Sequence, residues 1–136
     1  DVISSEGFAP ELARVVDPVG ALGFLQALGP DRVAMTFGSG GVLALHQGRP
    51  LAVPAFDLPV IDTTGAGDAF HAGYAFGLAK GWAFLECLRL GSAVAGLKCG
   101  SWGGRQGLPR LSEAQHVLET GITRYLDPRI AQFALV

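Results

Sequence analysis

The sequence predicts an α/β fold, in which strands and helices alternate along the chain. Three observations carry this prediction. The chain opens on the apolar, β-branched run "DVIS", Asp1–Ser4, which is typical of a strand. A largely apolar run, "RVAMTF", stands at residues 32–37. After Gly65 the spacing of the apolar residues changes from that of strands to that of helices.

Helix and strand follow one another in the first third of the chain. Apolar residues at helical spacing predict helix over Glu11–Leu28. The "DPVG" segment at residues 17–20 interrupts this pattern and predicts two helical pieces joined by a turn, and Gly29-Pro30 ends the second piece. The run "RVAMTF" is typical of a central strand that is buried on both faces.

Two further strands are predicted at the edge of the sheet. They are "VLALHQ" at residues 42–47 and "LAVPAF" at residues 51–56, with "GRP" as the turn between them and the loop "GSGG" before them. Their close spacing predicts an antiparallel hairpin. The prolines of the second strand agree with an edge position, since proline cannot donate to a neighbouring strand.

The second half of the chain is predicted to be helical. The helix that begins near Gly65 is apolar nearly all round and is therefore expected to be buried. An amphipathic helix is predicted over Ala83–Leu97, and the Gly-rich loop "CGSWGGRQGLP" follows it. A third helix is predicted at "SEAQHVLE", residues 112–119, with Ser112 as its N-cap.

Composition limits the class of protein. The 136 residues suffice for one domain, and hydrophobic residues make up 49% against 16% charged. This balance, with a chain that does not open on Met, predicts a fragment that buries surface against the rest of its protein or a second subunit, as in a homodimer. A net charge of −2 predicts no nucleic-acid partner, and the short apolar runs predict no membrane span. Cys87 and Cys99 are expected to be reduced thiols of a cytoplasmic protein.

The stretch "VIDTTGAGDAF", Val60–Phe70, carries the candidate chemistry. The first amides of a helix lack intrahelical partners, and the helix dipole adds about half a positive charge there. Because Gly65 and Gly67 have no side chain, an anion can lie directly on these N–H groups. The segment is therefore predicted to cradle a phosphoryl group without a lysine.

Asp68 places a carboxylate beside this predicted cradle. A base next to an anion site suits phosphoryl transfer to a hydroxyl, because the base takes the proton while the amides hold the charge. The alternative is a carboxylate in the first turn that the helix dipole merely favours. The chain contains no G-x-x-x-x-G-K-[ST], and Phe70 stands where the dinucleotide fingerprint requires a third glycine.

The longer string "DTTGAGDAFHAG", residues 62–73, closely resembles the signature of the pfkB, or ribokinase-like, family of carbohydrate kinases. "TFGSGGV" at residues 36–42 looks like the family's nucleotide-binding strand and glycine loop. "RLGSAVAGLKCGSWGGRQGLP" at residues 89–109 looks like the helix and loop that close over adenine and hold a monovalent cation.

The resemblance implies a ribokinase-like three-layer α/β/α sandwich with a mostly parallel central sheet. Residues 1–136 would be its C-terminal nucleotide-binding and catalytic-base portion, without the half that supplies the sugar-binding residues and the lid. Because a lid excludes water and positions substrate, this chain alone is expected to bind nucleotide weakly and to transfer little phosphoryl.

The resemblance also implies roles for particular residues, with ATP, Mg²⁺ and K⁺ as cofactors and a small sugar as substrate. Asp68 matches the catalytic base. The anion hole is matched by Gly65, Ala66 and Gly67. Positions lining the nucleotide are matched by Thr36, Gly38, Ser39, Gly41 and Ser92. The potassium site is matched by Asp62 and Thr64, with backbone carbonyls from Lys98, Ser101 and Gly103.

The chain departs from the family at one motif. Many members carry N-x-x-E after the first strand, but "SEGFA" has Glu6 where Asn is expected and Ala9 where Glu is expected. The motif is also absent from the ketohexokinase branch, which the "VAGLKCG" segment resembles. Magnesium is then expected to be held by water and substrate phosphates, an arrangement that this ion tolerates.

Three functions remain open from the sequence. The first is an ATP-dependent sugar kinase, with a fructose-like ketose as the favoured substrate and a sulfo-sugar or keto-deoxy acid as rivals. The second is a vitamin or nucleoside kinase of the same superfamily. The third is a catalytically silent nucleotide-binding regulatory protein, against which the presence of Asp68 weighs. His71 is expected to make a backbone hydrogen bond, and Trp82 and Trp102 to pack in the core or a loop.

Overall fold

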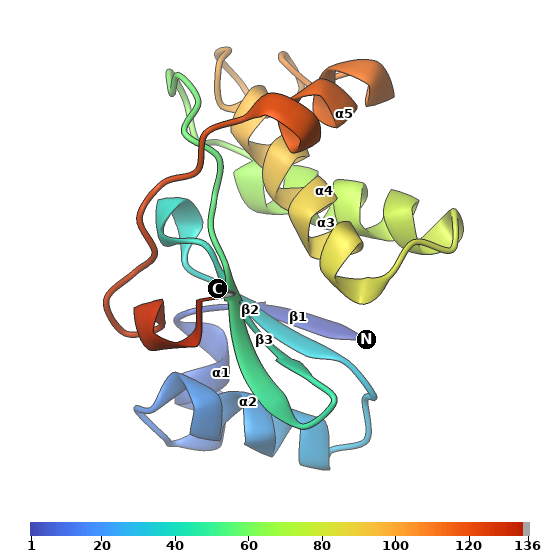
Figure 1. The fold of residues 1–136 in the computed structure, drawn as a ribbon. Helices are drawn as coiled ribbons and strands as arrows, with labels where there is room; N and C mark the ends of the chain where they lie inside the picture. Colours follow the sequence, from blue (N-terminus) through green and yellow to red (C-terminus); the bar gives the residue numbers. More distant parts are fainter. Residues whose placement is uncertain (135–136) are drawn as a thin grey trace. The chain divides into compact units, whose positions relative to one another are not determined.

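The computed structural model describes residues 1–134, and these residues form two compact units (Figure 1). The first unit contains residues 1–54 together with the C-terminal segment that begins at Tyr125. The second unit is Ala55–Arg124. No helix in the described part of the chain is long and apolar enough to cross a membrane.

The first unit contains a four-stranded mixed sheet. Its strands are β1 (Val2–Ser5), β2 (Val33–Thr36), β3 (Val42–His46) and β4 (Arg49–Val53), in the order β1-β2-β3-β4. The β1 and β2 strands are parallel, whereas the β2–β3 and β3–β4 pairs are antiparallel. The sequence predicts a mostly parallel sheet, but in this part of the chain only one of the three strand pairs is parallel. Tight connections join the strands of the other two pairs, and only antiparallel neighbours can be joined in this way.

The central strand and the edge hairpin are confirmed. Strand β2 lies between two neighbours, and its residues Val33–Met35 are buried. Strand β4 is at one edge of this four-stranded sheet and contains Pro50. The turn of the hairpin is Gln47-Gly48 rather than the predicted "GRP". Both turn residues have positive φ, 52° and 76°, which is the geometry of a tight hairpin turn whose twist matches that of its strands.

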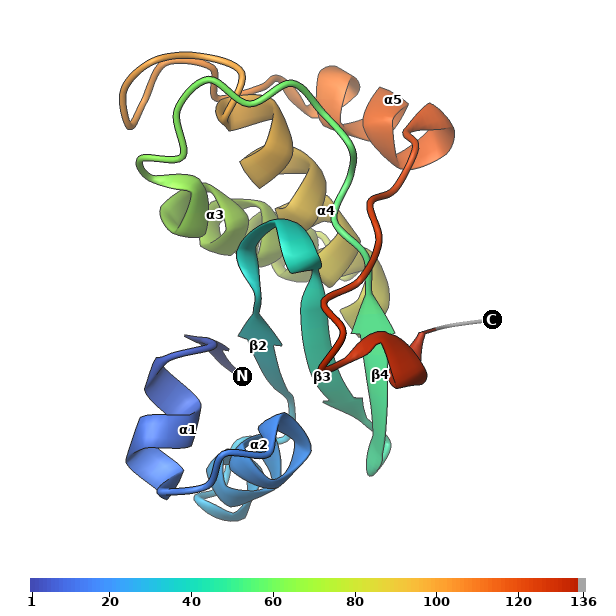
Figure 2. The same ribbon diagram turned by 90° about the vertical axis from the view of Figure 1, so that its left-hand side faces the viewer.

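Two short helices pack on this sheet (Figure 2). They are α1 (Phe8–Ala13) and α2 (Pro18–Ala27). The Asp17 carboxylate accepts the Gly20 N–H at 2.7 Å and caps α2, and Pro18 takes its first position. The predicted two helical pieces joined by a turn are therefore confirmed. The turn precedes Pro18, and "DPVG" begins the second helix, because Asp and Pro are favoured at a helix start.

Three helices make up most of the second unit. They are α3 (Ala66–Ala79), α4 (Phe84–Lys98) and α5 (Leu111–Thr120). Helices α3 and α4 approach each other closely at two glycines. A Cβ on Gly73 would lie only 3.0 Å from the Gly91 Cα. The expectation that α3 is buried nearly all round is wrong. Only the face that packs against α4 is buried, whereas Ala72, Phe76 and Ala79 on the other side of the helix are exposed.

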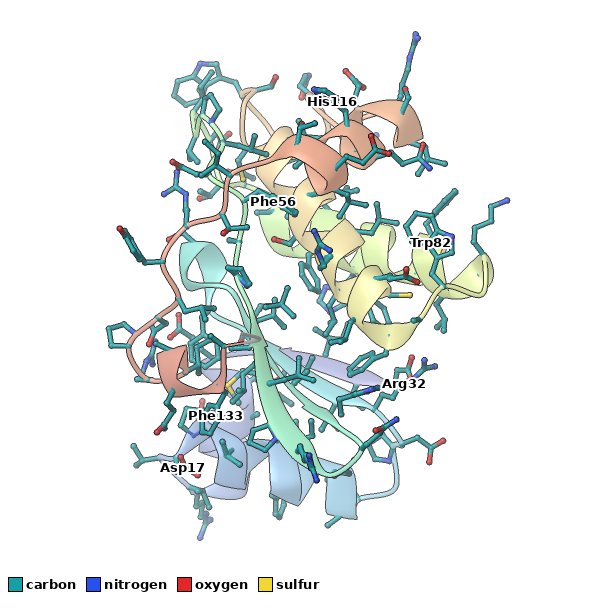
Figure 3. The ribbon with its side chains drawn as sticks, in the orientation of Figure 1. Asp17, Arg32, Phe56, Trp82, His116 and Phe133 are labelled. Atoms are coloured by element: carbon teal, nitrogen blue, oxygen red, sulfur yellow. The ribbon has the colours of Figure 1, made fainter. Side chains whose placement is uncertain are left out.

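A small apolar cluster around Phe56, Leu90 and Val117 joins α4 and α5, and Trp82 packs at its edge (Figure 3). Helix α5 begins at Leu111, and its N-cap is Arg110, whose N–H donates to the Glu113 carboxylate at 2.6 Å. The predicted cap at Ser112 is therefore wrong, because Glu113 satisfies the start of the helix from inside its first turn.

Candidate active site

The start of helix α3 presents backbone N–H groups that the protein does not use. Gly65 caps the helix with φ of 76°, and no side chain caps it. The Ala66 N–H donates to the Thr63 carbonyl at 3.0 Å, and the first intrahelical bond runs from the Ala69 N–H to the Gly65 carbonyl at 2.9 Å. Among the described residues, the amides of Gly65, Gly67 and Asp68 have no hydrogen-bond acceptor.

Of the three residues predicted for the anion hole, Ala66 is thus the exception. Its amide already has a protein acceptor, because the left-handed conformation of Gly65 turns the Ala66 N–H back toward Thr63. The three backbone amides without an acceptor in the described residues are therefore those of Gly65, Gly67 and Asp68.

The space around Gly67 is open, whereas the space around Gly65 is filled. A Cβ on Gly67 would meet no atom within 4 Å, whereas one on Gly65 would lie 3.0 Å from the Gly104 carbonyl oxygen. Gly65 is therefore required by the protein's own packing and by its positive φ. No packing within the described residues requires a glycine at position 67. The Asp68 side chain is exposed in the same turn, with no hydrogen bond or ion pair in the described part of the chain.

Asp62 fixes the segment that leads into this turn. One carboxylate oxygen accepts the Thr64 N–H at 2.9 Å, and the other accepts the Gly103 N–H at 2.7 Å. Hydrogen bonds from the Thr64 amide and hydroxyl, then from the Gly103 amide, lower the pKa of Asp62 to about 2, with the charge of Lys98 adding to the effect. Asp62 therefore joins the start of α3 to the Gly-rich loop.

Lys98 makes contacts that the sequence did not predict. It was expected to offer its backbone carbonyl to a potassium ion, but that carbonyl accepts the Ser101 N–H at 3.3 Å. Its side chain is fully buried, and the ammonium Nζ donates to the Asp62 main-chain carbonyl oxygen at 3.0 Å. The structure thus brings together Asp62, Thr64, Lys98, Ser101 and Gly103, with Lys98 contributing a charge.

The remaining predicted residues of this unit have varied positions. Ser92 is buried in α4, with 7% of its surface exposed. His71 Nδ1 donates to the Gly67 carbonyl at 2.8 Å, which confirms the expected backbone hydrogen bond. Trp82 packs against the α4–α5 cluster as predicted, but Trp102 is 73% exposed and does not pack within the described residues.

The glycine loop of the first unit is closed by its own backbone. The Phe37 N–H donates to the Gly41 carbonyl at 2.8 Å, and the 3₁₀ turn η1 (Gly38–Gly40) lies between them. Gly38 and Ser39 are exposed at the tip, whereas Gly41 is buried. Thr36, at the end of β2, donates its hydroxyl to the Ser4 carbonyl at 3.3 Å. The four residues predicted to line the nucleotide in this unit therefore lie in one short segment, residues 36–41, and differ in exposure.

A charged cluster that the sequence did not predict supports this loop. The Asp127 N–H donates to the Gly40 carbonyl at 2.9 Å. The Arg129 guanidinium pairs with the carboxylates of Asp127 and Glu6 and lies 4.9 Å from the Phe37 ring centre. Hydrogen bonds from the Arg129 side chain, then from its amide, lower the pKa of Asp127 to about 2.

Two further features bear on possible ligands. Within residues 1–134, no group of three or more His, Cys, Asp or Glu side chains could hold a metal ion. A groove of about 360 Å³ between α4 and α5 is lined by Trp82, Glu86, Arg89, Gln115, Leu118 and Glu119. None of these residues belongs to the predicted site, so the groove is separate from the proposed chemistry.

Comparison with solved structures identifies the fold. A structure described as Arabidopsis thaliana ribokinase complexed with ribose and ATP is 28% identical, with a TM-score of 0.78 over 87% of this chain and 41% of that chain. The chain therefore has the ribokinase-like α/β fold. A family model described as pfkB family carbohydrate kinase matches residues 9–111. The chain belongs to the pfkB family of carbohydrate kinases.

Two curated relatives are similar to parts of the chain. An uncharacterized sugar kinase of Archaeoglobus fulgidus is 43% identical over 83 residues, which are 61% of this chain and 33% of the relative. Mouse ketohexokinase is 51% identical over 58 residues, 42% of this chain and 20% of the relative. The chain spans about a third of the length of the first curated relatives that it matches.

Proposed function

We propose that the protein containing this chain transfers a phosphoryl group from ATP to a hydroxyl of a sugar. The observation that carries the proposal is the start of α3, where amides without protein acceptors lie in the same turn as the exposed Asp68 carboxylate. A negatively charged group is stabilised at such a helix start, and a carboxylate beside it can accept a proton.

Each group has a definite part in the proposed reaction. Asp68 takes the proton of the sugar hydroxyl as that oxygen bonds to the γ-phosphorus of ATP. The bond from this phosphorus to the bridging oxygen breaks, and ADP leaves. The amides of Gly65, Gly67 and Asp68 hold the charge of the migrating phosphoryl and of the adjoining β-phosphate that leaves with ADP, because stabilisation of the charge that develops there accelerates transfer.

ATP and a sugar are supported by the comparisons, since the Arabidopsis relative is a complex with ribose and ATP. We assign the nucleotide to Thr36, Gly38, Ser39, Gly41 and Ser92. Mg²⁺ would neutralise the ATP phosphates, which with water would supply most of its ligands, because the described residues contain no metal-binding cluster of acidic, His or Cys side chains. The reduced, buried Cys87 and Cys99 suit a cytoplasmic protein.

A ketose is the proposed substrate. The support is the mouse ketohexokinase relative, 51% identical over 58 residues. A sulfo-sugar and a keto-deoxy acid are the rival acceptors. The acceptor contacts belong mostly to sequence outside this chain, so a panel of sugars with the complete protein decides among them.

The test is Asp68→Asn in the complete protein. We expect kcat to fall by about 10²- to 10⁴-fold, because the amide cannot accept the proton. The dissociation constant for ATP should change by less than about threefold, since the asparagine keeps the shape of the side chain. Asp31→Asn, another exposed carboxylate, is the matched control and should leave kcat unchanged. Retention of most of the activity by Asp68→Asn would contradict the assignment of the base.

Nucleoside kinases are the second candidate, because solved nucleoside kinases share this fold. A vitamin kinase remains in the same class. Phosphorylation of nucleosides or vitamins, with none of any sugar, would favour them. A silent nucleotide-binding protein would bind ATP and phosphorylate neither. The isolated 136-residue chain is expected to show little transfer in any of these cases.

A further inference from the structure

Lys98 is a buried cation beside the proposed phosphate-binding turn. Its side chain has 0% of its surface exposed, although it is the last residue of α4 and the Gly-rich loop follows directly. Its Nζ donates to one protein acceptor in the described part of the chain, the Asp62 main-chain carbonyl at 3.0 Å. Burial of an ammonium is costly unless negative groups compensate it.

Three sources of negative potential meet at this ammonium. The Asp62 carbonyl oxygen is in direct contact with it. The Asp62 carboxylate belongs to the same residue and accepts the Thr64 and Gly103 amides. The C-terminal end of α4 adds the negative end of a helix dipole. The folded chain therefore builds a site for a single positive charge at Asp62.

Two of the five residues predicted to hold potassium, Asp62 and Lys98, already have other contacts through the groups that would face the ion. Both Asp62 carboxylate oxygens accept backbone N–H groups, and the Asp62 carbonyl accepts the Lys98 ammonium. The Lys98 carbonyl accepts the Ser101 N–H, and a Cβ on Gly107 would lie only 2.8 Å from that oxygen. A potassium ion on the Asp62 carbonyl would lie next to the ammonium, and two like charges at that separation repel strongly.

We propose that the Lys98 ammonium is the built-in monovalent cation of this site, in place of a potassium ion at Asp62. It holds the Asp62 carbonyl, while the Asp62 carboxylate holds the Thr64 and Gly103 amides. Lys98 is thus a positioning residue that sets the turn from Asp62 to Gly67 before a phosphate arrives. The inference rests on the proposed function, since the turn that it sets is the proposed anion site.

Three variants of the complete protein test the proposal. Lys98→Met keeps the apolar stem and removes the charge. Lys98→Ala leaves room for an ion. Lys80→Met removes the chain's other lysine, which is exposed at the end of α3, and is the matched control. ADP binding is measured by titration calorimetry, and Tm by scanning calorimetry, in KCl and in choline chloride of equal ionic strength.

The wild type and Lys80→Met should bind ADP equally, within twofold, in both salts. Lys98→Met should bind ADP at least tenfold more weakly in both salts. Lys98→Ala should regain affinity and Tm in KCl or ammonium chloride but not in choline chloride, a rescue that a purely structural role would not give. The Tm comparison needs no kinase activity, so it stays decisive if no sugar is phosphorylated and the proposed function fails.

Two results would overturn the proposal. One is a wild type that loses tenfold or more in ADP affinity when choline replaces potassium. The other is a Lys98→Met variant that binds ADP as the wild type does. If Lys98→Ala does not fold, Lys98→Met and the salt comparison of the wild type decide the question alone.

Discussion

Gly41 and Gly67 lie in two different glycine-rich turns and are glycines for opposite reasons. In the first unit, a Cβ on Gly41 would lie 2.5 Å from the Val53 carbonyl oxygen, so the protein's own backbone fills the space that a side chain needs. In the second unit, a Cβ on Gly67 would meet nothing within 4 Å. Packing therefore requires a glycine at position 41, whereas packing within the described residues gives no reason for a glycine at position 67.

This difference separates a glycine that the fold requires from one that leaves space for a proposed ligand. In the loop Phe37–Gly41, the amides of Phe37, Gly40 and Gly41 donate within the loop, and the Gly40 carbonyl accepts the Asp127 N–H. At the start of α3, the Gly67 and Asp68 amides stay without acceptors in the described residues. Open space and available N–H groups at the same place are what an anion site requires. Substitutions by alanine distinguish the two cases.

Gly41→Ala is expected to have the largest effect on stability. The residue has φ of 98°, which L-residues rarely adopt, and the added methyl would clash with backbone that cannot easily move. We expect the free energy of unfolding to fall by about 3 kcal/mol, measured by urea denaturation.

Gly38→Ala is the control for this prediction. It also has positive φ, 55°, but a Cβ there would meet no atom within 4 Å. Its loss should be about 1 kcal/mol, the backbone cost alone. Equal losses for the two variants would show that the contact with Val53 does not limit substitution at position 41.

Gly67→Ala is expected to separate ligand binding from stability. Alanine in a helix is favoured over glycine by about 0.5–1 kcal/mol, so the free energy of unfolding should rise slightly. The methyl group would occupy the space above the open amides, and the affinity for ADP should fall about tenfold, or about 1.4 kcal/mol.

Gly23→Ala provides the matched comparison, because Gly23 is an exposed position within α2 with no atom near its Cβ. It should give the same small gain in unfolding free energy without any change in ADP affinity. Unchanged affinity in Gly67→Ala would mean that the turn does not receive a phosphate.

Regular elements were predictable where local pattern decides them. The hairpin of β3 and β4 and helices α3 and α4 follow from alternation and helical spacing. The errors lie at boundaries, where one residue type has two uses. Asp17 and Pro18 begin a helix here, although the same residue types often end one. At the start of α5, the Glu113 carboxylate accepts a backbone N–H, in place of the cap predicted at Ser112.

The candidate site was predictable only where its residues are consecutive. Asp68 and its glycines form one motif, so the sequence alone indicates them. Lys98 lies 36 residues from Asp62, and Arg129 lies 123 residues from Glu6. Contacts over such separations depend on the fold, although a lysine within the apolar run "AVAGLKCG" is a signal that could have indicated a buried charge.

The smallest expected effect compares the two aspartates that hold these turns. The pKa of both Asp62 and Asp127 is lowered from an ordinary value of 3.8 to about 2. Because the folded state favours the ionised form, each contributes stability that is present above about pH 4 and lost as the pH falls toward 2. The Tm should therefore be flat above pH 5 with respect to both groups.

Salt distinguishes the two aspartates, because their partners differ. Backbone amides and a hydroxyl hold Asp62, whereas the exposed Arg129 guanidinium holds Asp127. Salt at 1 M shortens the Debye length to about 3 Å and so weakens solvent-exposed ion pairs more than it weakens hydrogen bonds to backbone amides. In scanning calorimetry at pH 7, we expect 1 M NaCl to shrink the Tm loss of Asp127→Asn and to leave that of Asp62→Asn nearly unchanged. Equal sensitivity to salt would mean that charge, rather than backbone hydrogen bonding, fixes the turn before α3.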